Sequence, residues 1–126
     1  MKSREALIRL KRFQVEEKRR QTAQIESMIA EFERMEKELN DQVLAEQERS
    51  GIHDAGHFAY PTFAKAATQR RDNLAASELA LRQQLAAAKT ACEEAEAELA
   101  KVEAIAERDQ ANDKHSSTQR TAPAHG

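Results

Sequence analysis

Two histidines and an aspartate, all potential metal ligands, lie together in one short stretch: His53, Asp54 and His57. Imidazole and carboxylate groups can share a divalent cation. These residues lie in a glycine-containing stretch, however, where an aspartate commonly caps a turn and the neighbouring histidines stay in solvent. We therefore expect a structural corner, with no metal site and no cofactor.

The single cysteine, Cys92, is the other residue whose type could do chemistry. A nucleophilic cysteine needs an activating base, and no histidine lies near Cys92 in the sequence or across the helix pairing predicted below. Among its alanine neighbours it should act as a small hydrophobic residue. A lone cysteine also suits a reducing cytosol. With no phosphate loop, paired-carboxylate pocket or nucleophile elbow either, we do not expect an enzyme.

The elements that carry these residues are bounded by helix breakers. All glycine and proline residues before the C-terminal end fall between Gly51 and Pro61. The pattern predicts one helix from about residue 3 to 49, a corner at 50–61 and a second helix from about 62 to 110. With 33% charged and 4% aromatic residues, the chain can bury a thin seam between two helices but not a compact globular core.

Hydrophobic spacing predicts which side chains form this seam. Steps of three and four residues place one apolar set on a single face of the first helix: Ile25, Met28, Ile29, Phe32, Met35, Leu39 and Val43. Two heptad series run along the second helix: Leu74, Leu81, Ala88, Ala95 and Val102, and Glu78, Leu85, Cys92, Leu99 and Ala106. Glu78 is the exception in an otherwise apolar seam.

Charge predicts the direction in which the helices pair. Residues 1–24 hold eight basic and three acidic residues, whereas residues 89–109 hold seven acidic and three basic ones. An antiparallel hairpin sets these two segments side by side. The fold class predicted is therefore all-α: a long antiparallel two-helix coiled-coil hairpin over residues 1–111. Residues 112–126 lose both periodicity and hydrophobicity and are predicted to form a disordered C-terminal tail.

Two segments resemble the flagellar export protein FliJ family, in its alphaproteobacterial type. They are KSREALIRLKRFQVEEKRR at residues 2–20 and HFAYPTFAKAATQRRDNL at residues 57–74. The resemblance implies a cytoplasmic coiled-coil rod of the flagellar type III export apparatus, peripheral to the basal body. Its partners would be the export ATPase ring, the export-gate membrane protein and export chaperones. This short polar C-terminal tail differs from many FliJ-like sequences, which continue as a helix.

Six residues are candidates for partner contact. The basic group lies near the N-terminus and the aromatic pair lies at the corner: Arg4, Arg9, Lys11, Arg12, Tyr60 and Phe63. Two alternatives stay open at this point. The basic residues could instead be neutralised by the second helix, and the aromatic residues could simply lock the turn.

Other classes of function fit less well. A net charge of −2 gives no overall attraction to nucleic acid or to anionic lipid, and no apolar stretch is long enough for membrane insertion. The alternative function is a generic cytoplasmic coiled-coil adaptor or a self-assembling scaffold. Self-association into a homo-oligomer through leftover apolar residues, such as Leu7, Leu10 and Phe13, is left open.

Overall fold

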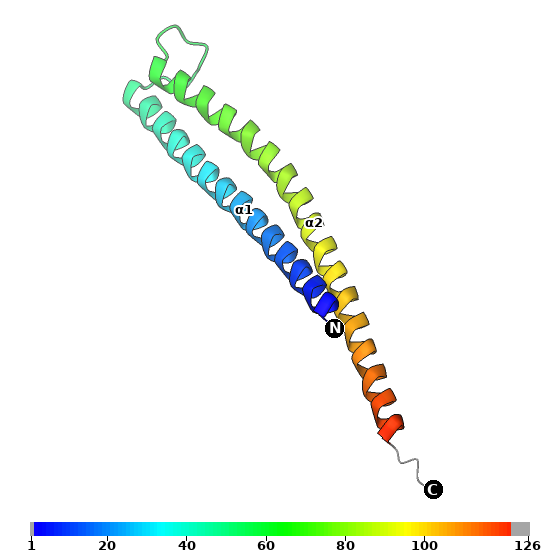
Figure 1. Cartoon of the computed structure of the whole chain (residues 1–126). Coiled ribbons are helices and arrows are strands. Elements are labelled where there is room, and N and C mark those ends of the chain that lie inside the picture. Colours follow the sequence, from blue (N-terminus) through cyan, green and yellow to red (C-terminus); the bar gives the residue numbers. More distant parts are fainter. Residues whose placement is uncertain (1, 122–126) are drawn as a thin grey trace. The chain divides into compact units, whose positions relative to one another are not determined.

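The computed structural model describes the backbone of residues 2–121 and the side chains of residues 3–114. Within that range the regular structure is helical: α1 spans Lys2–Ser50 and α2 spans Thr62–Thr121. The residues between them form the corner, at the green end of both helices (Figure 1). The predicted all-α class and two packed helices are confirmed.

The breaks in the helices have local causes. Gly51 follows α1 with a φ of 72°, a left-handed conformation that glycine adopts without a steric penalty. Its amide donates a hydrogen bond of 2.9 Å to the Gln47 carbonyl, which closes the last turn of α1. The Pro61 carbonyl accepts the Lys65 amide at 3.1 Å, the first hydrogen bond of α2. Pro61 therefore stands immediately before the helix, where its missing N–H costs nothing.

The chain forms two compact units, each made from part of both helices. The first unit pairs residues 2–20 of α1 with residues 89–121 of α2. Its ion pairs join Arg4 to Asp109, Arg12 to Glu103 and Arg19 to Glu96. The partner number on α2 falls as the number on α1 rises, so the two segments run antiparallel. Val15 is its buried core residue among those described.

The second unit comprises residues 21–88 and contains the corner. It is also antiparallel, since Glu33 pairs with Arg82 and Asn40 accepts a hydrogen bond from Arg71. Seam positions from both helices and small residues at the start of α2 form its buried core: Ile29, Val43, Ala64, Ala67 and Leu81. The alanines let α2 approach α1 closely just after the corner.

Two details differ from the sequence pattern. The second helix continues to Thr121 instead of ending near residue 110, because polar residues alone do not stop a helix and the next breaker is Pro123. Residues 122–126 of the predicted tail lie outside the described residues. Met28 is exposed, not in the seam, because the neighbouring Ile29 occupies the inward position on that turn.

Candidate partner-binding surfaces

Three of the four basic candidates are paired within the chain. The Arg4 guanidinium lies 2.9 Å from the Asp109 carboxylate, and the Lys11 ammonium lies 2.9 Å from that of Glu98. A third pair joins Arg12 to Glu103 at 3.1 Å. The second helix therefore neutralises these three side chains, which is one of the two alternatives that the sequence left open.

The electrostatics of the Lys11 pair show what such contacts do. A hydrogen bond from Lys11, and then its charge, lower the pKa of Glu98 below the ordinary value of 4.5. The Lys11 side chain is half-buried at a seam position. Lys11 thus links α1 to α2, and its charge is neutralised by Glu98 within the first unit.

Arg9 is the exception in the basic group. Its side chain is exposed and has no ion-pair partner among the described residues. Beside it, three large apolar side chains are also exposed: Leu7, Leu10 and Phe13. They follow one another at three-residue steps and so lie along one side of α1. We call these three residues the N-terminal apolar strip. Together with Arg9 it forms an exposed surface near the N-terminal end of α1 that has no ion-pair partner among the described residues.

The corner is held by hydrogen bonds within consecutive turns. The Asp54 carboxylate accepts the Gly56 amide at 2.9 Å, an Asx turn, and the Asp54 carbonyl accepts the His57 amide at 3.0 Å. The next turn is closed by the Tyr60 amide, which donates to the His57 carbonyl at 3.0 Å. The His57 ring contributes as well, because Nδ1 accepts the Ala59 amide at 3.0 Å. The corner is therefore a defined structure despite its exposure.

This geometry gives Asp54 and His57 a structural role in the corner. Asp54 stabilises a turn, and His53 and His57 are exposed, as the capping interpretation predicted. Among the residues that the structure describes, no three His, Cys, Asp or Glu side chains are grouped so as to hold a metal ion.

The aromatic candidates at the corner separate into two roles. The Tyr60 hydroxyl accepts a hydrogen bond of 3.0 Å from the Gln47 side chain, so Tyr60 ties the corner to the end of α1. Phe63, in the first turn of α2, is exposed. Phe58 is 97% exposed and stacks on His57 with ring centroids 4.7 Å apart. Phe58 was not among the six contact candidates, although the sequence already groups it with Tyr60 and Phe63 at the corner.

Cys92 has an environment unlike that of a nucleophile. Burial, followed by a hydrogen bond with Glu96, raises the pKa of the Cys92 thiol. The sulfur lies 3.5 Å from a Glu96 oxygen. A raised pKa keeps the thiol protonated, whereas nucleophilic cysteines need a lowered one.

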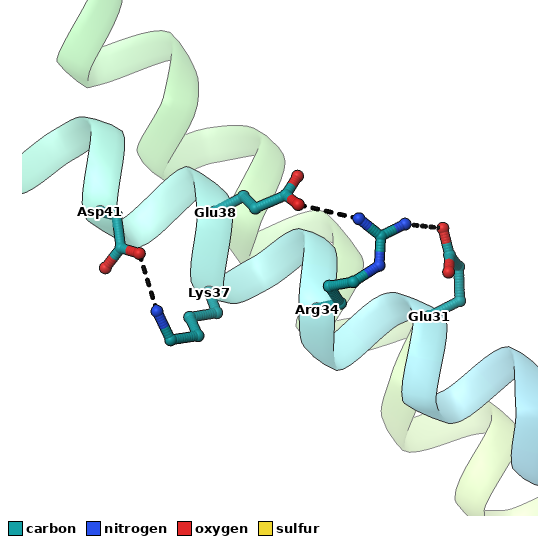
Figure 2. A network of polar contacts seen from close by, with 5 residues as sticks. All are labelled: Glu31, Arg34, Lys37, Glu38 and Asp41. Atoms are coloured by element: carbon teal, nitrogen blue, oxygen red, sulfur yellow. Dashed lines mark hydrogen bonds and ion pairs between the residues drawn. The ribbon is translucent and has the colours of Figure 1, made fainter.

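The outer face of α1 in the second unit carries two neighbouring groups of ion pairs between successive turns (Figure 2). Arg34 lies between Glu31 and Glu38, and Lys37 donates to Asp41 at 2.9 Å. The hydrogen bond to Glu31 is the main cause that raises the pKa of Arg34. All five side chains are exposed and belong to one helix, so this network is a solvated helix surface that offers no enclosed site.

No helix within the described residues combines the length and the apolar composition that a bilayer-spanning segment needs. Comparisons with protein-family models, with curated proteins and with solved structures gave no match to this chain. The resemblance to the FliJ family therefore rests on the residues of its two quoted segments.

Proposed function

We propose that this chain is a non-enzymatic component of the flagellar type III export apparatus that binds the export ATPase ring through the start of α1. The observation that carries the proposal is the N-terminal apolar strip, which stays exposed beside the unpaired Arg9. The resemblance of residues 2–20 to the FliJ family names the partner. The antiparallel pairing of α1 and α2 is the fold that this resemblance implies.

The paired and unpaired basic residues at the start of α1 have different roles in this proposal. Arg4, Lys11 and Arg12 are engaged with α2 and set its register on α1. Contact with the ATPase falls instead to the strip and to Arg9. Large apolar side chains gain about 1.5 to 3 kcal/mol each on full burial, so two of them can dominate an interface of modest size.

The corner supplies a second surface in this proposal. Phe58 and Phe63 are both exposed, and the hydrogen-bonded turns hold Phe58 outward. An aromatic side chain fixed in this way loses little entropy when an apolar pocket takes it up. We assign this surface to the export-gate protein or to the export chaperones, the other partners that the resemblance implies. The whole assembly would lie in the cytoplasm beside the basal body.

Binding to the hexameric export ATPase tests the proposal. Leu10→Ser and Phe13→Ser should each weaken binding at least about tenfold, which corresponds to about 1.4 kcal/mol. The chain provides matched controls in the second unit. Leu44 is 51% exposed against 50% for Leu10, and Leu79 is 60% exposed against 59% for Phe13. Leu44→Ser and Leu79→Ser should bind as the wild type does.

The charge of Arg9 can be tested without disturbing the fold. Arg9→Glu breaks no ion pair among the described residues, whereas reversal of Lys11 or Arg12 would also repel the second helix. We expect Arg9→Glu to reduce ATPase binding at unchanged helicity. A wild-type chain that is fully helical and does not bind the ATPase would refute the proposal. That result would favour the generic adaptor.

A further inference from the structure

Two glutamates face each other inside the helix interface of the second unit. Glu36 lies seven residues after Ile29 and seven before Val43, both of which are buried core residues. It therefore occupies an inward heptad position on α1. Across the interface on α2, Glu78 lies three residues before the buried Leu81. Carboxylates at such positions interrupt an otherwise apolar core.

The carboxylate oxygens of Glu78 have little hydrogen bonding. Its side chain is 18% exposed, and Oε1 is buried with no hydrogen-bond partner among the described residues. The other oxygen, Oε2, accepts a hydrogen bond of 3.4 Å from Nε of Arg82. Arg82 also pairs with Glu33 on α1. One guanidinium thus serves two carboxylates, with Glu36 as a third acidic group beside them.

The charged groups around Glu36 come from both helices. Burial, and then the charge and hydrogen bonding of Glu78, raise the pKa of Glu36 above 4.5. Glu33 adds to this effect and Arg82 opposes it. Arg82 pairs with Glu78 on its own helix and with Glu33, one turn before Glu36 on α1, so the antiparallel register brings the Glu36 and Glu78 side chains together. Two ionised carboxylates cannot hydrogen bond, however, because neither has a proton to donate.

We propose that Glu36 and Glu78 form a proton-sensitive contact that closes the helix interface of the second unit when they share a proton and loosens it when both are ionised. A shared proton supplies the missing donor and removes one of two facing charges. Its loss leaves two partly buried negative charges beside a single arginine. The interface would then separate locally and expose the flanking seam residues Phe32 and Leu39.

The direction of the pH dependence follows from linkage. A carboxyl whose pKa is higher in the folded chain binds more protons there than in the unfolded chain. The contribution of Glu36 to the stability of the second unit therefore increases as the pH falls from neutrality toward 4.5, the ordinary pKa for Glu36. Most acid-sensitive proteins change in the opposite direction, because their carboxylates are paired in the folded state.

Urea denaturation of the full chain at about pH 8 and about pH 5.5 tests the contact. The wild-type midpoint should be higher at the lower pH. Glu36→Gln and Glu78→Gln each place a neutral amide donor at the contact, so both variants should lose most of this difference and exceed the wild type at the higher pH. Glu48→Gln is the matched control, since Glu48 is exposed on the same helix, and it should keep the wild-type difference.

Carbon-detected NMR titration of the glutamate carboxyl groups provides a second measurement that does not depend on variant stability. Glu36 should titrate above 4.5 in the wild type and return toward that value in Glu78→Gln. A pH difference in the urea midpoint that both glutamine variants retain in full would overturn the proposal. So would an ordinary titration of Glu36 in the wild-type chain.

Discussion

Substitution of two leucines within one turn of α2 tests the helix interface most sharply. Leu81 is 7% exposed, whereas Leu79 is 60% exposed and lies two residues earlier on the same helix. Removal of a buried leucine side chain costs about 2 to 5 kcal/mol, partly through the cavity that remains. A two-helix interface is a single layer deep, so neighbouring side chains and water can fill that space. We therefore expect about 2 kcal/mol for Leu81→Ala, at the low end of that range.

The matched change, Leu79→Ala, should alter the unfolding free energy by no more than about 0.5 kcal/mol, as is usual for exposed positions. Urea denaturation followed by far-ultraviolet circular dichroism measures both values. With a urea slope of roughly 2 kcal/mol per M, Leu81→Ala should lower the midpoint by about 1 M. Equal losses in the two variants, or a greater loss in Leu79→Ala, would mean that a different face of α2 meets α1. The assignment of the core would then be wrong.

Three further predictions follow from local geometry. Gly51→Ala should lower the unfolding free energy by about 1 kcal/mol, because a residue with a Cβ is strained at a φ of 72° even though no atom lies within 4 Å of that Cβ. Thermal melts should detect this loss, and an unchanged melting temperature would contradict the strain. Cysteines introduced at Val15 and Ala95, with the native cysteine removed, should crosslink within one chain through a short bifunctional maleimide at low concentration, and exclusively intermolecular products would reject the antiparallel pairing. Because Lys11 lowers the pKa of Glu98, their ion pair stabilises the chain above pH 4.5, and this contribution disappears as the pH falls through the lowered pKa of Glu98. Acid titration of helicity should show less of this pH sensitivity in Glu98→Gln, and a curve identical to that of the wild type would show that the pair is not formed.

The sequence predicted the ends of the helices at the corner well, because glycine and proline act locally. The left-handed φ of Gly51 and the place of Pro61 before α2 depend on the backbone of one or two residues. The C-terminal end of α2 was harder to predict. Polar composition lowers the gain from packing but leaves helix propensity in place, so the helix continues to Thr121.

Heptad spacing also identified the most buried seam residues. Ile29, Val43 and Leu81 are buried as predicted, whereas Met28 is not. Steps of three and four residues allow either of two adjacent side chains to take the inward position, and packing decides between them. Spacing drew attention to Glu78, which lies inside a heptad series of the second helix, but not to Glu36, because the apolar steps traced on the first helix pass directly from Met35 to Leu39.

The candidate contact residues show a similar limit. Segment charge predicted the antiparallel direction that the ion pairs confirm. Composition could not predict which basic side chains would form ion pairs with α2 and which would remain without such a pair. The distinction between Lys11, which is paired, and Arg9, which is not, depends on the angular positions of both on α1. In the sequence, the residues of the N-terminal apolar strip could be recognised only as hydrophobic residues outside the predicted seam. Their exposure in the structure shows that they form a surface.

Site-specific photocrosslinking to the hexameric export ATPase tests the central claim most directly. Benzoylphenylalanine in place of Phe13 probes the N-terminal apolar strip, and the same group in place of Leu44 probes an exposed apolar position on α1 in the second unit. Helicity of both variants should match the wild type. The account predicts a covalent product with the ATPase from position 13 and little or none from position 44. Equal yields from the two positions, or no product from position 13, would contradict it.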